Sequence, residues 1–398
     1  MLYKNASKKS RSLFATLLLV FSLSADLYAA PGDLDPTFGN GGVVTTKMSN
    51  DYDVITDIKL QPDGKVVTAG LVYRICDGGY DTLCNLPMRL AFINRYLSTG
   101  VLDKSFGNGG KIIFTHKDGE YISKIALQPD GKIVAVGHLL GGGSAIVFRY
   151  NANGTLDASF GTGGKAVPSL YGSALGVVIQ PDGKIVVNES FGVVRYNADG
   201  SLDAAFGTGG TASVAASDMA LQPDGKIVAS GSGFFHYVLL RLNSNGTLDS
   251  TFGAGGYAIT DIAGGAYAVA LQPDGKILVN GSSGIVRYNT NGSIDTSFAI
   301  NGVFASEIDV SQDIALQADG KIVAAGGYSG FALTRLNPDG SPDTSFGTNG
   351  NVITLIDGSR GSVGNALALQ PDGKILSGGS IYQSSGIADA AILRYSGE

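Results

Sequence analysis

Apolar residues in this chain come in short runs broken by turn residues, and one stretch shows the pattern best. Residues 126–134 read Ala-Leu-Gln-Pro-Asp-Gly-Lys-Ile-Val. Pro presets the backbone angle of the first turn position, Asp suits the second, and Gly adopts the left-handed conformation that follows. Because apolar, β-branched residues flank the turn, the stretch predicts a tight β-hairpin.

Two motifs alternate along the chain. The turn motif Gln-Pro-Asp-Gly-Lys occurs seven times, 42 to 67 residues apart, with Ala318 in place of Pro in one copy. The second motif is Leu-Asp-x-x-Phe-Gly, which departs from the pattern at Ala299 and Pro342. The turn motif has its Gln at Gln61, Gln128, Gln180, Gln222, Gln272, Gln317 and Gln370, and the second has its Asp at Asp35, Asp103, Asp157, Asp203, Asp249, Asp295 and Asp343.

One repeat predicts four short strands. In the third copy we expect strand a at 165–168, strand b at 174–180, strand c at 184–187 and strand d at 191–196. Residues 185–187 are apolar without alternation, which is typical of a strand covered on both faces. Seven units of four antiparallel strands predict an all-β, seven-bladed β-propeller. A β-helix would have shorter rungs, and an outer-membrane barrel would need strands of about 9–11 residues.

The two motifs together resemble the delta-60 repeat family. The resemblance covers residues 34–395 and rests on long motifs, Leu-Gln-Pro-Asp-Gly-Lys-Ile-Val and Arg-Tyr-Asn-x-x-Gly-x-Leu-Asp-x-x-Phe-Gly-x-Gly-Gly. It implies a propeller domain whose function is largely uncharacterised, so it supports the fold and adds almost no chemistry.

The first 29 residues have the pattern of a secretory signal. Four basic residues are followed by the apolar stretch 13–23 and a small-residue cleavage site at 27–29. The alternative is a membrane anchor, but 11 apolar residues fall short of the ~20 needed to span a bilayer. We therefore expect residues 30–398 to form a propeller that is periplasmic or extracellular, with no transmembrane segment after cleavage.

Net charge narrows the class of partner. The whole chain carries −6. The signal has four basic residues and Asp26, a net +3, so the mature chain carries −6 − 3 = −9. An acidic exported protein is not expected to bind nucleic acid or anionic membranes.

Cys76 and Cys84 are the two cysteines of the chain. In an exported protein they predict a disulfide, which would stabilise the fold by roughly 2–3 kcal/mol on the chain-entropy estimate. A metal site is the alternative, but it lacks nearby His or further Cys.

Constant spacing suggests a repeated ion pair. Six of the seven Arg residues that end strand d stand eight residues before a motif Asp, as Arg149 does before Asp157. We expect each pair to hold one blade to the next. Arg394 has no downstream Asp and Asp35 has no upstream Arg, so we expect these two to meet and close the ring. The other five are Arg95, Arg195, Arg241, Arg287 and Arg335.

The two ends of the propeller differ. The b–c and d–a turns share one face and are nearly identical between copies, whereas the a–b and c–d loops share the opposite face and vary. Function is expected on the variable face, where blades 7, 1 and 2 have distinctive polar and aromatic loops. The alternative is that these are ordinary solvated loops with no shared site. The candidate binding residues are Tyr73, Arg74, Tyr80, Asp81, His116, Asp118, Glu120, His138, Arg360, Tyr382 and Gln383.

Catalytic chemistry has little support in the sequence. His116 and His138, with Asp118 and Glu120, could ligate a metal or act as acid and base, but no H-x-x-x-H or G-x-S-x-G motif accompanies them. Turns such as 151–157 share residues with calcium loops, yet their Gly comes too early. We assign no catalytic residue, metal or cofactor.

We expect a monomeric binding module for an unknown protein or carbohydrate ligand. The first alternative is a propeller enzyme of the lyase or hydrolase kind. The second alternative is a structural component of the envelope or cell surface.

Overall fold

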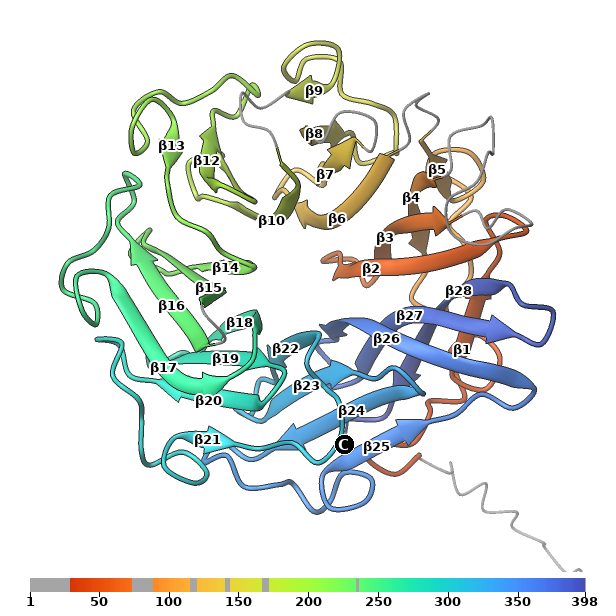
Figure 1. Ribbon diagram of the computed structural model, residues 1–398. Coiled ribbons are helices and arrows are strands. Elements are labelled where there is room, and N and C mark those ends of the chain that lie inside the picture. Colours follow the sequence, from red (N-terminus) through yellow and green to blue (C-terminus); the bar gives the residue numbers. More distant parts are fainter. Residues whose placement is uncertain are drawn as a thin grey trace, which may run out of the picture.

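The computed structural model describes residues 29–73, 89–114, 120–139, 144–166, 172–233 and 236–397. These residues form 28 β-strands and no α-helix, arranged as a ring around a central opening (Figure 1). No helix of the described residues is long and apolar enough to cross a membrane. The all-β propeller expected from the repeats is confirmed.

Five sheets have four antiparallel strands each, in chain order. They are β6 (Glu120–Leu127), β7 (Ile133–Leu139), β8 (Ala145–Tyr150) and β9 (Lys165–Ala166); β10 (Ala174–Ile179), β11 (Ile185–Glu189), β12 (Gly192–Tyr196) and β13 (Thr211–Ala212); β14 (Asp218–Leu221), β15 (Ile227–Gly233), β16 (His236–Leu242) and β17 (Tyr257–Ala263); β18 (Ala266–Leu271), β19 (Ile277–Gly281), β20 (Gly284–Tyr288) and β21 (Val303–Phe304); β22 (Asp313–Leu316), β23 (Ile322–Gly326), β24 (Phe331–Leu336) and β25 (Asn351–Thr354).

The sixth sheet has eight strands and contains both ends of the described chain. It joins β2 (Tyr52–Leu60), β3 (Val66–Tyr73), β4 (Arg89–Tyr96) and β5 (Lys111–Ile113) to β26 (Ser359–Leu369), β27 (Ile375–Gln383), β28 (Ala388–Tyr395) and β1 (Val43–Thr46). The two sets of four meet at a single parallel bridge between Tyr52 and Ala388. Because N-terminal β1 pairs along C-terminal β28, the two ends of the chain close the ring.

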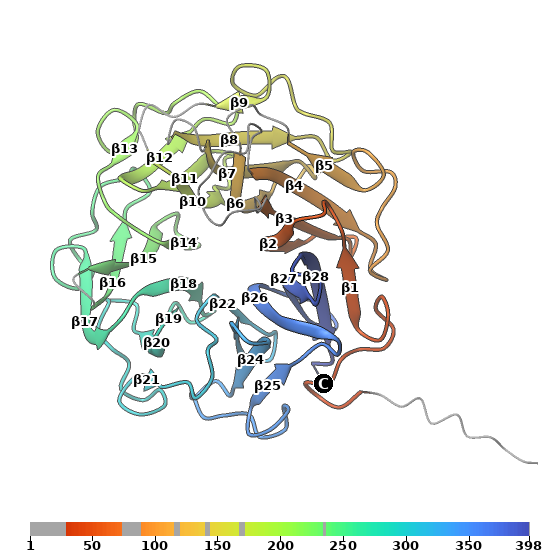
Figure 2. The same cartoon turned by 45° about the vertical axis from the view of Figure 1, so that its right-hand side comes forward.

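Each set of four strands is called a unit below. The first strand of each unit lies innermost, and β2, β6, β10, β14, β18, β22 and β26 contact one another in a closed circle around the opening (Figures 1 and 2). The fourth strand of each unit lies outermost. The connection from an outermost strand therefore crosses to the innermost strand of the next unit.

The expected grouping of strands within a blade was wrong in one respect. Residues 165–166 form β9, which pairs with β8 in the unit of β6–β9 and not with β10. The link between β8 and β9, residues 151–164, returns the chain antiparallel to β8, so those two strands pair as neighbours. The b–c and d–a turns still share one face, because strand direction alternates through the unit.

The apolar strands form a core between neighbouring units. Val134 and Val136 of β7 pack in one cluster with Ile185 and Val187 of β11. All five residues of β11 are buried. A middle strand is covered by the preceding unit on one side and by the next on the other, which explains its lack of alternation.

A repeated clasp joins the units on the face of the hairpin turns. Arg149 Nε lies 2.8 Å from Asp157 Oδ2, and its guanidinium carbon lies 4.6 Å from the centre of the Phe160 ring. Its Nη1 donates to the carbonyl oxygen of Ala198 in the next unit. The ion pair thus lies within one unit, which corrects the expectation that it bridges two; the link between units is the hydrogen bond from Nη1.

The clasp occurs seven times among the described residues. Every Arg Nε lies 2.7–2.9 Å from its Asp Oδ2, including Arg394 and Asp35 at 2.8 Å. Arg394 also donates to the carbonyl oxygen of Ser98 at 2.7 Å, which ties the last unit to the first. The Lys of each turn motif approaches the same carboxylate, as Lys184 does to Asp203 at 2.8 Å.

Charge and hydrogen bonds keep the clasp carboxylates ionised. Burial of Asp343 favours its neutral form, but Ser345, Lys321 and Arg335 together outweigh burial and lower the pKa of Asp343 to about 2. The carboxylate is therefore charged throughout the neutral and mildly acidic range.

One glycine of the clasp is sterically required. Gly154 has a φ of +86°, and a Cβ there would lie 2.7 Å from the backbone nitrogen of Gly107 in the preceding unit. That nitrogen donates a hydrogen bond of 2.8 Å to the carbonyl oxygen of Asn153. A side chain at position 154 would thus separate the two units.

Substitution Asp35→Ala tests ring closure. It leaves the Arg394 guanidinium buried without its carboxylate, so we expect the free energy of unfolding to fall by about 3 kcal/mol. Urea denaturation measures the change. The control is Asp33→Ala, which removes a nearby exposed carboxylate and should change stability by less than about 0.5 kcal/mol. Equal effects of the two substitutions would contradict the role of the clasp.

Candidate functional site

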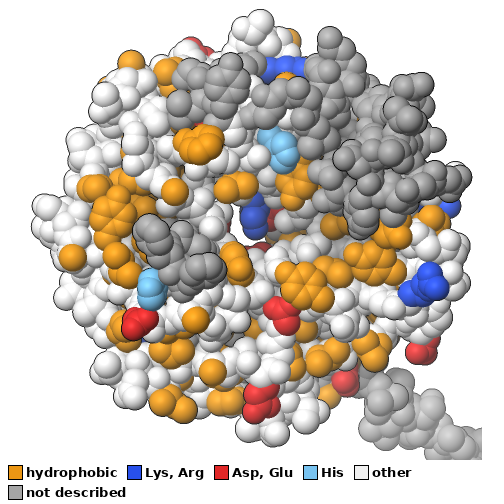
Figure 3. All heavy atoms as spheres, in the orientation of Figure 1, with side chains coloured by type: hydrophobic (Ala, Val, Ile, Leu, Met, Phe, Trp, Pro, Cys, Tyr) orange, Lys and Arg blue, Asp and Glu red, His pale blue; other side chains and the backbone are white. Residues whose placement is uncertain are grey.

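The face opposite the clasps carries the loops that differ between units. Figure 3 shows this face, with few charged side chains, scattered apolar ones, and a narrow central opening that has a basic side chain at its edge. The turn-motif Lys and Asp residues belong to the other face. Departures from the repeat on the variable face therefore identify the candidate site.

The innermost strands place one residue of each unit at the same level of the axis. This residue stands four positions before the motif Gln. Four of the seven are charged, and three are small and uncharged. In chain order they are Asp57, Lys124, Gly176, Asp218, Ala268, Asp313 and Ala366.

Lys124 supplies one ammonium group to this axial cluster, and Lys59 supplies another, which pairs with Asp57 Oδ1 at 2.8 Å. Its Nζ lies 3.9 Å from Oδ1 of Asp57, whose side chain is fully buried. Burial disfavours the ammonium, but the carboxylates of Asp57, Asp313 and Asp218 outweigh it and raise the pKa of Lys124. Lys124 is therefore charged at physiological pH.

The axial carboxylates also brace the ring. Asp57 accepts the backbone N–H of Ile125 at 2.8 Å, and Asp313 accepts that of Leu367 at 2.9 Å, each from the next innermost strand. Asp218 accepts the N–H of Val269 in the same way, at 3.0 Å. Burial raises the pKa of Asp218, although Lys124 opposes the shift.

A second group of residues lies where the first and last units meet. Strands β26 and β27 have 11 and 9 residues and β2 has 9, whereas β14 and β22 have 4 each. The ring centres of Tyr52 and Tyr382 lie 5.8 Å apart across this junction. Beside them, Gln383 donates to Asp389 at 2.9 Å.

Asp53 orders the connection that enters this junction. Its side chain is fully buried, and it accepts the N–H of Met48 at 2.6 Å and the hydroxyl of Ser49 at 2.9 Å. Burial raises the pKa of Asp53 despite these hydrogen bonds, and Asp389 adds to the shift. The crossing from β1 to β2 is thereby held in place.

The structure brings only some of the expected site residues together. Tyr382 and Gln383 lie at the junction just described, and Arg360 is exposed on β26. His138 stacks on Tyr121 of its own unit, with ring centres 4.9 Å apart. Tyr73 ends β3 and Glu120 begins β6, but their side chains are outside the described part of the structure. So are Arg74, Cys76, Tyr80, Asp81, Cys84, His116 and Asp118.

The axial cluster and Tyr52 are the residues that the sequence-based prediction missed. Their signal was available as a fixed offset of four residues before each motif Gln, at which identity varies between copies. Four charged residues at the same distance from the motif Gln, each in a mostly apolar strand, indicate that their side chains lie close together in the fold. That offset could not be read as axial before the innermost strand was known.

Two other features do not form a ligand site. Among the described side chains, no three His, Cys, Asp or Glu converge to hold a metal ion.

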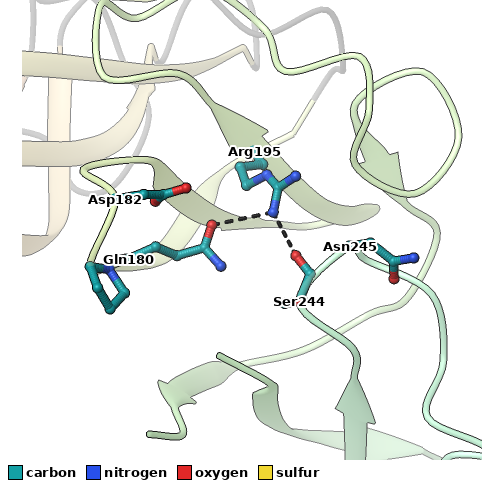
Figure 4. Close-up of a pocket in the computed structure, with 6 residues that line it drawn as sticks. Gln180, Asp182, Arg195, Ser244 and Asn245 are labelled. Atoms are coloured by element: carbon teal, nitrogen blue, oxygen red, sulfur yellow. Dashed lines mark hydrogen bonds between the residues drawn. The ribbon is translucent and has the colours of Figure 1, made fainter. Parts of the chain in front are cut away.

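On the clasp face, a hollow of about 350 Å³ lies between Gln180, Arg195 and Ser244. Arg195 donates there to Ser244 and Gln180, at 2.5 and 3.3 Å (Figure 4). The polar centre of the hollow is therefore a clasp.

Comparison with known families agrees with the fold. A family model described as a domain of unknown function (DUF5122) beta-propeller matches residues 128–160, 180–206, 222–252, 272–298, 317–346 and 370–397. The chain is a β-propeller repeat protein. No curated protein matches its sequence.

Solved structures share the propeller fold at low identity. A streptogramin B lyase is 12% identical with a TM-score of 0.57, over 89% of this chain and 97% of the lyase. A catalytically inactive virginiamycin B lyase from Staphylococcus aureus with quinupristin is 12% identical with a TM-score of 0.56, over 88% and 98%. YCF48 bound to D1 peptide is 13% identical with a TM-score of 0.55, over 93% and 98%.

Substitution Lys124→Met tests the axial cluster. It removes the ammonium that the three axial carboxylates share and leaves only Lys59, which pairs with Asp57, so we expect the free energy of unfolding to fall by about 2 kcal/mol. Adding Asp218→Asn should recover part of the loss, because it removes one of the repelling charges. Lys47→Met, at an exposed site, is the control for chemical denaturation. No loss for Lys124→Met, or no recovery in the double variant, would contradict the coupling.

Proposed function

We propose that the protein is an exported, seven-bladed propeller that acts as a binding module through its variable face. The contact surface is the junction of the first and last units together with the adjoining axial cluster. The observation that carries the proposal is the placement of non-repeated side chains: charges gather at one level of the axis, and Tyr52 meets Tyr382 where the strands are longest. Side chains that differ between units can recognise one particular ligand, whereas the seven repeated clasps present the same groups in every unit.

Seven blades is the count that the repeats support. The chain has seven turn motifs, seven Arg–Asp pairs and seven innermost strands in one circle. On this count the eight-stranded sheet is two blades joined by one bridge. The signal at 1–29 and the disulfide between Cys76 and Cys84 belong to the same proposal.

The ligand class is a protein segment or a carbohydrate. Paired Tyr rings offer flat apolar surface with a polar edge, which suits peptide and sugar alike. One protein of the same fold is bound to a peptide, which supports a protein segment as the ligand. The axial cluster has three carboxylates and two ammonium groups, those of Lys124 and Lys59, so its net charge is negative and favours a ligand that presents positive charge.

An enzyme of the lyase kind is the alternative, because two lyases share the fold over most of their length. Of the two described histidines, His138 stacks within its own unit and His236 lies 3.2 Å from exposed Asp261. Neither stands at the axial positions, which favours binding over catalysis. A structural role at the cell surface is the further alternative.

Partner capture from cross-linked whole cells tests the binding role. The bait is the full chain, compared with the double variant Tyr52→Ala with Tyr382→Ala. We expect the double variant to recover its partner about tenfold less, because buried Tyr anchors carry much of the energy of an interface. The control is Tyr328→Ala, which removes an exposed Tyr from the loop after β23.

Equal recovery by all three baits would contradict the proposed surface. Recovery of no macromolecule by any bait would contradict the binding role itself. Melting temperatures of the purified variants show whether a loss of recovery reflects unfolding.

A further inference from the structure

One buried carboxyl belongs to neither the clasps nor the axial cluster. Glu189, the last residue of β11, is fully buried. Its Oε1 accepts a hydrogen bond from the Tyr196 hydroxyl at 3.3 Å, and among the described residues its Oε2 has no hydrogen-bond partner. Such a group costs stability when it is ionised, because nothing replaces its hydration.

Glu189 occupies a position that is glycine in every other repeat. The position lies nine residues after the motif Gln. At Gly137 and Gly379 a Cβ would fall 1.7 and 1.8 Å from a backbone oxygen of the innermost strand. Innermost strand β10 begins only at Ala174, opposite Glu189, whereas β6 and β26 run on past the matching point. The other glycines are Gly70, Gly231, Gly281 and Gly326.

The side chain lies at the interface between the units of β6–β9 and β10–β13. Alternation along β11 puts Glu189 on the same side as Ile185 and Val187. Those residues pack against the unit of β6–β9 in a cluster whose members from β7, β8, β10 and β12 are apolar apart from the hydroxyl of Tyr196. Tyr196 hydrogen-bonds Glu189, and alternation along β7 puts His138 on the side of that strand that carries Val134 and Val136, so His138 is the second titratable group on this interface.

The Tyr196 hydroxyl is used differently from its counterparts. Tyr96 donates to Thr46 at 2.8 Å and Tyr395 to Thr354 at 2.9 Å, each across to the preceding unit. Tyr196 donates instead to Glu189, on the neighbouring strand of its own sheet. The carboxyl thus replaces a contact between units with one inside a unit.

We propose that Glu189 makes the interface between these two units sensitive to pH. With its proton, the carboxyl is neutral and is tolerated among apolar side chains. When the proton leaves to solvent, the carboxylate needs hydration that only an opened interface supplies. The interface is therefore closed at acidic pH and loosens as the pH rises. The inference goes beyond ligand binding and does not depend on it.

The direction follows from linkage. Burial raises the pKa of Glu189 to about 7 from its ordinary 4.5, although the Tyr196 hydrogen bond opposes the shift. The folded state then holds a proton that the unfolded chain has released, so the contribution to stability is full below the ordinary pKa and is lost as pH rises through the folded one. The clasp carboxylates behave in the opposite sense, because their pKa values are lowered.

Two variants of the full chain test the proposal. Glu189→Gln keeps the shape without the ionisation, and Glu189→Gly restores the residue of the other repeats. We expect the melting temperature of the wild type to fall relative to both variants between about pH 4.5 and about pH 7, with half of the fall reached near pH 6 and little further change above about pH 7. If Glu189→Gln fails to fold, Glu189→Gly carries the same comparison.

Amide hydrogen exchange localises the effect. At about pH 8 the amides of β11 and β12 should exchange several-fold faster in the wild type than in Glu189→Gln, and at about pH 4 the two should agree. Amides of β19 and β20 in a distant unit are the control and should show no difference at either pH. Parallel melting profiles, or equal exchange in β11 and β12 at both pH values, would overturn the proposal.

Discussion

The arginine clasp is the interaction on which the ring depends. Each guanidinium pairs with a carboxylate at 2.7–2.9 Å, lies over a Phe ring of the same motif and donates to a carbonyl of the next unit. The guanidinium group of arginine is planar and always charged, and it donates hydrogen bonds in several directions. The ammonium group of lysine lacks the planar, forked arrangement of donors. Because each unit buries its apolar strands only against neighbours, the ring is stable only if every unit is held, including the last to the first.

This constraint divides the molecule into two faces. The clasp face uses its polar groups to hold neighbouring units, and it has little freedom to vary without weakening the ring. The variable face is free of that demand, since its loops join strands that are already fixed at their other ends. The Tyr52–Tyr382 contact appears there, and the charges at the axis stand on the innermost strands. Glu189 shows that a single departure from the repeat can also enter the interface between units.

Sequence reasoning predicted the features that repeat and missed those that depend on position in space. Turn chemistry at Pro129 and Gly131 predicted the hairpins, and the eight-residue spacing of Arg149 and Asp157 predicted their contact. The same spacing did not show that Nη1 reaches the next unit, because that link goes to a backbone carbonyl with no sequence signature. Residues 165–166 were grouped with the wrong sheet, since a strand of two residues carries no periodicity. Lys124 and Asp218 are 94 positions apart, and only the closed ring of innermost strands makes them neighbours.

The division between a structural face and a binding face is tested most directly by titrating a captured partner against two purified variants, with unfolding measured on the same samples. Arg241→Lys, in a clasp, should lower the free energy of unfolding and leave the affinity of the folded protein unchanged. Asp218→Asn, at the axis, should preserve the fold and weaken binding about tenfold, since it removes one desolvated charge from the surface. Weakened binding in the clasp variant with none in the axial variant would contradict the account.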